Sequence, residues 1–187
     1  MLATQDPAPV VLTVGHSTRP LAEFIDLLQA HTVAVLLDVR AVPRSRHNPQ
    51  YNIDTLPVAL AAEGIGYEHG AGLGGFRKTH AGSANAGWRN LSFRGYADYM
   101  QTPQFAEQLQ VLIARATRER VVLMCAEAVP WRCHRSLIAD ALVVHGLRVE
   151  EIISMSRREV HVLTRFARVS GTAITYPPEA ESLPNGM

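Results

Sequence analysis

The side chains best suited to chemistry gather between positions 125 and 135. An apolar run at residues 121–124 has the character of a β-strand and leads to Cys125 and Glu127. After a short loop, Arg132 begins an apolar segment that we expect to be a helix as far as His145. Ligands of open α/β sheets bind outside the carboxyl ends of the strands. A helix start also presents free N–H groups and a positive dipole end. The segment therefore predicts a site for an anionic ligand.

Glu127 and Cys125 are the candidate catalytic groups of this segment. Glu127 follows Cys125 by two positions, and we expect it to act as a general acid or base. Cys125 lies before a helix start and near Arg132, which favours a thiolate nucleophile. The alternative is that Cys125 fills the strand end as a small apolar residue. Cys125, Cys133 and His134 lack the paired Cys-x-x-Cys spacing of zinc sites, so we expect no metal and no cofactor.

Polar side chains also follow two earlier apolar runs. His16 and Ser17 come after residues 10–14, and Asp38 comes at the end of residues 33–39. Because the carboxyl ends of parallel strands meet at one edge of a sheet, we expect these groups to lie near Glu127. His16 and Asp38 are then further candidates for acid–base catalysis. The alternative for His16 is a structural histidine that is held by hydrogen bonds. For Asp38, the favoured interpretation is an ion pair with a neighbouring arginine.

Two segments in the middle of the chain carry excess positive charge. Residues 40–46 contain three arginines that would clamp a phosphate or carboxylate, or would form a solvated turn. Residues 70–95 are predicted to be one long loop, rich in glycine, in which basic and aromatic residues alternate. This pattern is typical of phosphate contacts combined with base stacking, although the aromatics would also suit a small cluster beneath the loop. The predicted substrate contacts are Ser17, Arg40, Arg44, Arg46, Trp88, Phe93, Trp131, Arg132, His134 and Arg135.

Five expected strands alternate with helical patterns along the chain. This alternation predicts a single α/β domain at residues 10–170, with about five mostly parallel strands and helices on both faces, as in a Rossmann-like three-layer fold. A short extension, residues 1–9, would precede it. Residues 154–170 are predicted to contain a further helix, and residues 171–187 a loose tail. The expected strands are residues 10–14, 33–39, 65–69, 120–125 and 149–153, and the other expected helices cover about 21–28, 54–63, 102–116 and 132–145.

Composition restricts the protein class. The 187 residues are 47% hydrophobic and 19% charged with a net charge of +1, which is typical of one globular domain. We expect no signal peptide and no membrane partner, because no apolar segment reaches the roughly 18 residues of a membrane helix. Two cysteines do not make a disulfide framework, so a reducing cytoplasm is the expected location. The oligomeric state is left open.

Six short motifs, in order over about residues 10–155, resemble domain-of-unknown-function family 488. They are residues 15–19 (Gly-His-Ser-Thr-Arg), 38–40 (Asp-Val-Arg), 43–45 (Pro-Arg-Ser), 72–75 (Gly-Leu-Gly-Gly), 93–96 (Phe-Arg-Gly-Tyr) and 125–135. The resemblance implies a compact α/β domain of bacteria or archaea and no particular activity. The chain is also similar, more weakly, to rhodanese-like and cysteine-phosphatase folds. Six residues instead of five separate Cys125 from Arg132, and Glu127 would repel an oxyanion, so both features depart from the phosphatase pattern.

The leading hypothesis is an enzyme, or an enzyme-like binder, that acts on a phosphate-bearing substrate. A nucleotide or nucleic acid is the expected partner, and a hydrolase or DNA-processing activity fits the groups present. One alternative is a thiol-dependent sulfurtransferase or phosphatase-like enzyme that uses Cys125. The other is a nucleic-acid-binding module without catalysis.

Overall fold

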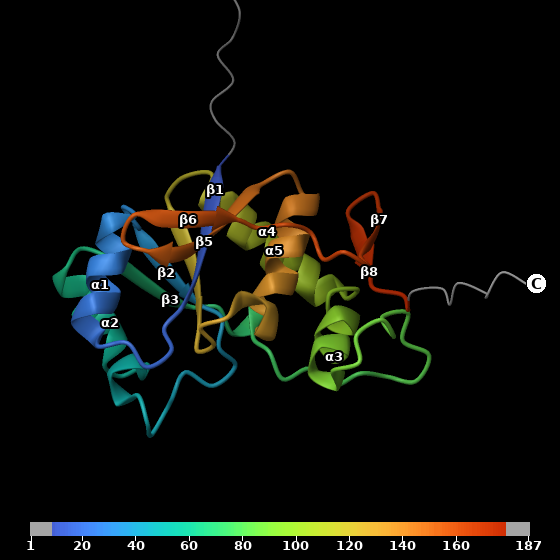
Figure 1. Cartoon of the computed structure of the whole chain (residues 1–187), viewed down its shortest axis with the longest axis horizontal. Helices are drawn as coiled ribbons and strands as arrows, with labels where there is room; N and C mark the ends of the chain where they lie inside the picture. Colours follow the sequence, from blue (N-terminus) through green and yellow to red (C-terminus); the bar gives the residue numbers. More distant parts are fainter. Residues whose placement is uncertain (1–8, 179–187) are drawn as a thin grey trace, which may run out of the picture.

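Six strands form one sheet in the order β3–β2–β4–β1–β5–β6 (Figure 1). The computed structural model describes residues 9–178. The five expected strands pair in parallel, and β6 (Arg157–Val160) is added antiparallel to β5 at the edge. The prediction of a mostly parallel α/β domain is therefore confirmed. The parallel strands are β1 (Val10–Gly15), β2 (Val35–Asp38), β3 (Gly66–His69), β4 (Val121–Cys125) and β5 (Arg148–Ser154).

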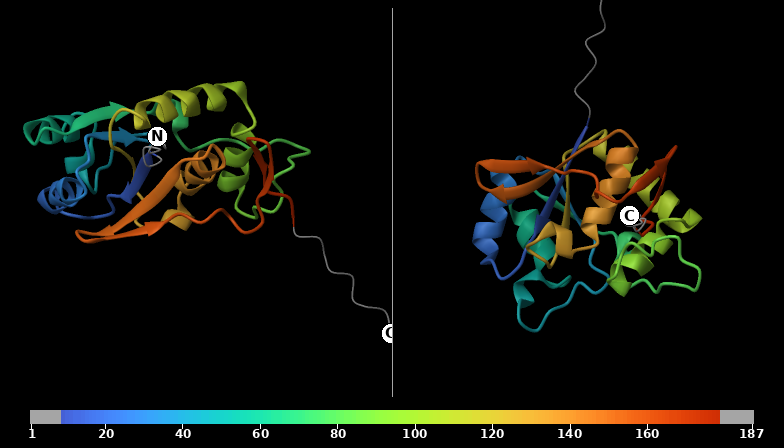
Figure 2. Two further views of the ribbon diagram at one scale, coloured as in Figure 1. Left: turned by 90° about the horizontal axis from the view of Figure 1, so that it is seen from above. Right: turned by 45° about the vertical axis from the view of Figure 1, so that its right-hand side comes forward.

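Helices cover both faces of the sheet, which gives three layers (Figures 1 and 2). α1 (Leu21–Ala30) and α2 (Leu56–Ala62) lie on one face. α3 (Leu91–Tyr99), α4 (Pro103–Ala116) and α5 (Arg135–Val144) lie on the other. Three short 3-10 helices, η1 (Pro49–Tyr51), η2 (Ala71–Leu73) and η3 (Pro130–Arg132), lie in the connections.

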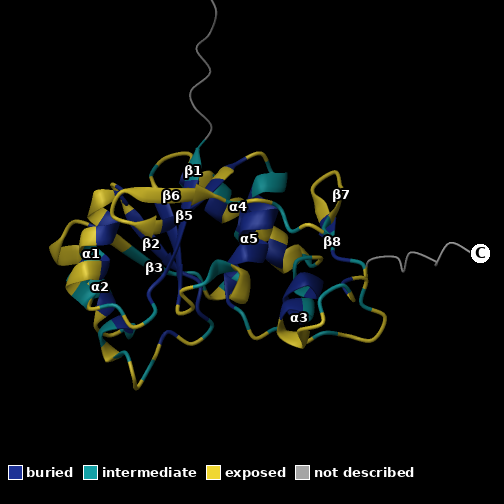
Figure 3. Cartoon of the chain, in the orientation of Figure 1, coloured by how far each residue is buried: buried dark blue, intermediate teal, exposed yellow. Residues whose placement is uncertain are grey.

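The central strands are buried on both sides, as their apolar runs predict (Figure 3). Successive side chains of a strand point to opposite faces. Val122 and Met124 accordingly pack with α1 and α2, whereas Leu123 and Cys125 pack with α4 and α5. This alternation decides which groups at the strand ends meet. Within residues 9–178, no helix is both long and apolar enough to cross a membrane.

Two predicted boundaries are wrong. The loop expected at residues 70–95 ends at Asn90, whose side-chain oxygen accepts the backbone N–H of Ser92 at 2.8 Å and caps α3. Phe93 therefore lies in a helix. The helix expected from Arg132 begins at Arg135, because residues 130–132 form a separate 3-10 turn.

The carboxyl-terminal predictions also need correction. Residues 154–170 do not form a helix but contain β6 and β7 (Arg168–Ser170), and β7 pairs with β8 (Ala173–Thr175). Asp140 of α5 holds this region, since its carboxylate accepts the N–H of Thr164 at 3.1 Å and the hydroxyl of Tyr176 at 2.8 Å. Tyr176 is fully buried, so the loose tail does not begin at residue 171. The rest of the predicted tail, residues 179–187, and most of the predicted extension lie outside the described residues.

Candidate functional site

The carboxyl ends of β1, β2 and β4 lie side by side and bring their following loops together. The N–H groups of His16 and Ser17 donate to the carbonyls of Cys125 and Ala126 at 3.0 and 2.9 Å. A Cβ at Gly15 would lie only 1.9 Å from the carbonyl oxygen of Glu127, so glycine permits this approach. The predicted groups thus reach one edge of the sheet, but strand alternation divides them into two clusters on opposite faces.

Asp38 and Arg40 form the first cluster, on the side of α1 and α2. Asp38 is fully buried, and its carboxylate accepts Arg40 Nε at 2.8 Å and the hydroxyl of Tyr67 at 2.9 Å. Arg40 Nη2 donates to the other oxygen of Asp38 and to the carbonyl of Tyr51. Both oxygens of Asp38 are therefore occupied, and the ion pair favoured from the sequence is present.

His16 completes the first cluster. Its ring stacks on Tyr51 with the centroids 4.0 Å apart. Nδ1 donates to the carbonyl of Ser17 at 2.7 Å, which leaves Nε2 to accept from Arg40 Nη1 at 3.4 Å. Burial lowers the pKa of His16, so the ring is held neutral. His16 is an acceptor fixed between Tyr51 and Arg40.

Cys125, Cys133 and His134 form the second cluster, on the side of α5. The two Sγ atoms and a ring nitrogen of His134 all lie within 4.8 Å of one another. His134 Nε2 donates to the carbonyl of Val39 at 2.9 Å, which turns Nδ1 toward Cys133 Sγ, 3.8 Å away. The hydrogen bond from Cys133 lowers the pKa of Cys125 and raises that of Cys133, its donor.

Two adjoining cavities open at this edge. The first, the thiol pocket, has a volume of about 310 Å³ and is lined by the second cluster with Phe76, Phe93 and Tyr96. The second, the arginine pocket, has a volume of about 430 Å³ and is lined by Arg44, Ser17, Asn48 and their neighbours. Both cavities share Arg40, Val42, Ala126, Glu127 and Arg132.

The predicted site residues are distributed unevenly around these cavities. Glu127 and Arg132 are exposed at the shared wall. Arg44 reaches the arginine pocket but makes a two-pronged surface ion pair with Asp54 at 2.9 and 3.0 Å. Arg46 is exposed and lines neither cavity.

The predicted stacking residues are also separated. Trp88 packs in an aromatic cluster, with its ring centroid 4.8 Å from that of Phe93 and 4.9 Å from that of Phe166. Phe93 is buried and forms part of the wall of the thiol pocket. Trp131 is 73% exposed, but it lines a third cavity. Trp88 therefore belongs to an aromatic cluster beneath the loop, which was the alternative to base stacking.

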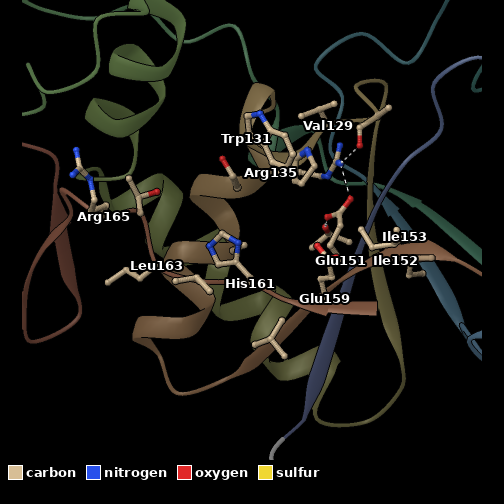
Figure 4. Close-up of a pocket in the computed structure, with 18 of the residues that line it drawn as sticks. Val129, Trp131, Arg135, Glu151, Ile152, Ile153, Glu159, His161, Leu163 and Arg165 are labelled. Atoms are coloured by element: carbon tan, nitrogen blue, oxygen red, sulfur yellow. Dashed lines mark hydrogen bonds and ion pairs between the residues drawn. The ribbon is translucent and has the colours of Figure 1, made fainter. Parts of the chain in front are cut away.

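The third cavity, about 660 Å³, lies between α5 and the β5–β6 edge (Figure 4). Arg135 lies at its base and is fully buried. Its guanidinium donates to Glu151 at 2.8 Å and to the carbonyls of Glu127 and Ala128 at 2.5 and 3.1 Å. Arg135 thus secures the loop after β4 and has no exposed surface to offer a substrate.

Two residues at the thiol pocket are absent from the sequence-based site. A Cβ on Gly75 would lie 3.1, 3.3 and 3.5 Å from Nδ1, Cε1 and Cγ of His134, so glycine allows the chain to approach the face of that ring. Phe76 is 85% exposed and has a φ of 57°, a conformation that non-glycine residues rarely adopt. Residues held this way cluster at functional sites. In the sequence, the two adjacent glycines that precede Phe76 indicate this strained turn.

The family model for DUF488, a domain of unknown function, matches residues 20–142. The chain belongs to this family. The match confirms the family resemblance and covers five of the six motifs, and the DUF488 region contains every residue named at the thiol pocket. His16 and Ser17 precede the matched DUF488 region. Searches of curated proteins and of solved structures each found no match.

Proposed function

We propose that this protein is an enzyme acting on a phosphate-bearing substrate, a nucleotide or a nucleic acid. The observation that carries the proposal is the junction of the two cavities. Three arginines line the arginine pocket against a single carboxylate, Glu127, and the same wall opens into the thiol pocket. A substrate whose anionic group binds in the arginine pocket would place its reacting group in the thiol pocket.

Arg132 and Arg44 are the proposed phosphate contacts. Arg132 is exposed, and no other described residue makes an ion pair or hydrogen bond with its side chain. The Arg44–Asp54 pair is solvent-exposed on both sides, and such pairs contribute little, so a phosphate can replace Asp54. Arg40 is committed to Asp38 and would contribute mainly its positive charge.

Glu127 and Phe76 are the proposed groups on the side of the reaction. Glu127 lies at the mouth of both cavities and would move a proton to or from the reacting group or an attacking water. Phe76 presents an exposed ring on which a base would stack. Hydrolysis of a glycosidic or phosphoester bond suits this set. Glu127→Gln is then expected to retain binding and to lose turnover.

Binding of labelled nucleotides and oligonucleotides, followed by fluorescence anisotropy at low and physiological salt, tests the proposal. We expect salt-sensitive binding that Arg132→Ala weakens. Arg118→Ala is the matched control, because Arg118 is exposed in the connection that enters β4 from its amino end. Absence of binding at low salt, or equal loss in both variants, would overturn the proposal.

A second candidate is thiol chemistry through Cys125. It is favoured by the position of Cys125 at the end of β4, where it lines the thiol pocket and where Cys133 and His134 lower the pKa of its thiol. It predicts rapid alkylation of Cys125 by iodoacetamide in the folded protein, slowed by a bound anion. An inert Cys125 would exclude it.

A further inference from the structure

Two sulfur atoms and one ring nitrogen converge at the thiol pocket, more donors than the proposed acid–base chemistry requires. We propose that Cys125, Cys133 and His134 bind a zinc ion whose fourth position faces the thiol pocket. Two thiolates and an imidazole are the ligands that zinc prefers, and three protein ligands with one open position are typical of catalytic zinc.

The distances fit this ion. Zinc lies about 2.3 Å from sulfur and 2.0 Å from nitrogen, so tetrahedral ligand atoms are about 3.5–3.8 Å apart. Cys133 Sγ and His134 Nδ1 are 3.8 Å apart, and the three donor atoms lie within 4.8 Å of one another. Small side-chain rotations would bring Cys125 to the same spacing.

The surroundings of the three donors are those of a metal site. Metal-binding histidines usually donate their second N–H to a carbonyl or carboxylate, as His134 does to the carbonyl of Val39. Cys133 Sγ also accepts the backbone N–H of Arg135 at 3.5 Å. This N–H would stabilise a thiolate ligand, and zinc would neutralise the two buried negative charges.

Gly75 packs against the face of the His134 ring, where a Cβ would stand 3.1, 3.3 and 3.5 Å from Nδ1, Cε1 and Cγ. This close packing helps to hold the orientation of the imidazole. The bound zinc would supply a Lewis acid or an activated water at the same cavity as Glu127.

Sequence spacing did not predict this site, because its ligands come from two elements. Cys125 ends β4, whereas Cys133 and His134 lie between η3 and α5. The 3-10 turn at residues 130–132 returns the chain to the strand end. A paired Cys-x-x-Cys motif is therefore unnecessary here.

Cobalt and zinc titrations of the chelator-treated full chain test the proposal. We expect one Co²⁺ per chain, with a sulfur-to-cobalt charge-transfer band, intense tetrahedral d–d bands and displacement by Zn²⁺. His134→Ala should weaken Zn²⁺ binding more than about 100-fold, beyond the effect typical of outer-shell contacts. His145→Ala, at the end of α5, is the matched control and should bind as the unmutated protein does.

A second readout needs no variant. Zn²⁺ should protect both cysteines of the unmutated protein from an aromatic disulfide reagent, and the chelator should restore their reactivity. Absence of the cobalt bands, or thiols equally reactive with and without Zn²⁺, would overturn the zinc site. Because neither assay contains a nucleotide, a failed zinc site and a failed nucleotide site are distinguishable.

Discussion

Arg40 clamps the carboxylate of Asp38 at the end of β2, with Nε donating to one oxygen and Nη2 to the other. Asp38 is fully buried, and Arg40 is 6% exposed. Since Arg40 also lines both cavities, this ion pair determines the shape of the wall between the thiol pocket and the arginine pocket.

Arg40→Ala should destabilise the fold strongly. Removal of one partner leaves Asp38 as an uncompensated buried charge, a change that typically costs about 3–5 kcal/mol. Urea denaturation followed by circular dichroism measures the free energy of unfolding. Arg44→Ala is the control, because its exposed pair with Asp54 should contribute no more than about 1 kcal/mol. Equal losses in the two variants would contradict the structural role of Arg40.

Asp54→Ala should tighten nucleotide binding and lower the free energy of unfolding by no more than about 1 kcal/mol. The change frees Arg44 from its surface partner and removes one negative charge beside the arginine pocket. Anisotropy titrations at low salt should show a lower Kd, and the gain should shrink at high salt as screening increases. Glu63→Ala, on the C-cap of α2, is a control for the loss of an exposed acidic residue. Weaker binding by Asp54→Ala would show that the pair orders the site.

Phe76→Gly should weaken nucleotide binding and leave the free energy of unfolding nearly unchanged. Glycine adopts a positive φ without the cost of about 1–2 kcal/mol that other residues incur, although it gains freedom in the unfolded chain. The free energy of unfolding should therefore change by less than about 1 kcal/mol. Loss of base stacking should raise the Kd for a nucleotide by about 5- to 150-fold. Phe76→Trp retains a ring and should retain binding; if glycine binds as well as tryptophan, Phe76 does not stack on the ligand.

Asp98 should make stability depend on pH in the acid range. Burial alone would raise its pKa, but hydrogen bonds from Ser83, Asn85 and Thr79 lower the pKa below its ordinary value. The folded state thus favours the carboxylate. Its contribution is present above about pH 4 and is lost as the pH falls through the pKa of the folded protein.

The comparison for this prediction is Asp98→Asn, measured by urea denaturation between neutral pH and pH 3. At neutral pH the variant should be about 1–3 kcal/mol less stable, because donors aimed at Asp98 lose a charged acceptor. The difference from the unmutated protein should narrow in acid. A constant difference across the series would exclude Asp98 as the titrating group.

The fold was predictable because its signals are local. Largely apolar runs mark β1, β2 and β4, and the Thr102 cap before Pro103 marks α4. β6 was not predictable, since its four residues are exposed and acquire their structure only by pairing with β5. Tyr176 likewise owes its burial to Asp140, 36 residues earlier in the chain.

The part of the site that lies at the carboxyl ends of the strands was predictable from the sequence. Cys125, Glu127, Asp38 and His16 all lie at the expected edge, but their separation by strand alternation was not foreseen. Arg135 shows the limit most clearly. Its partner Glu151 lies on β5, and nothing in the spacing of residues 132–135 distinguishes this buried arginine from the exposed Arg132.

Amide chemical shifts during titration with a nucleotide test most directly the claim that the carboxyl edge binds it. We expect the largest shifts at residues 126–132 and at Gly75 and Phe76, with Arg132→Ala weakening the response. Shifts concentrated at residues 159–165, around the third cavity, or no shifts at low salt, would contradict it.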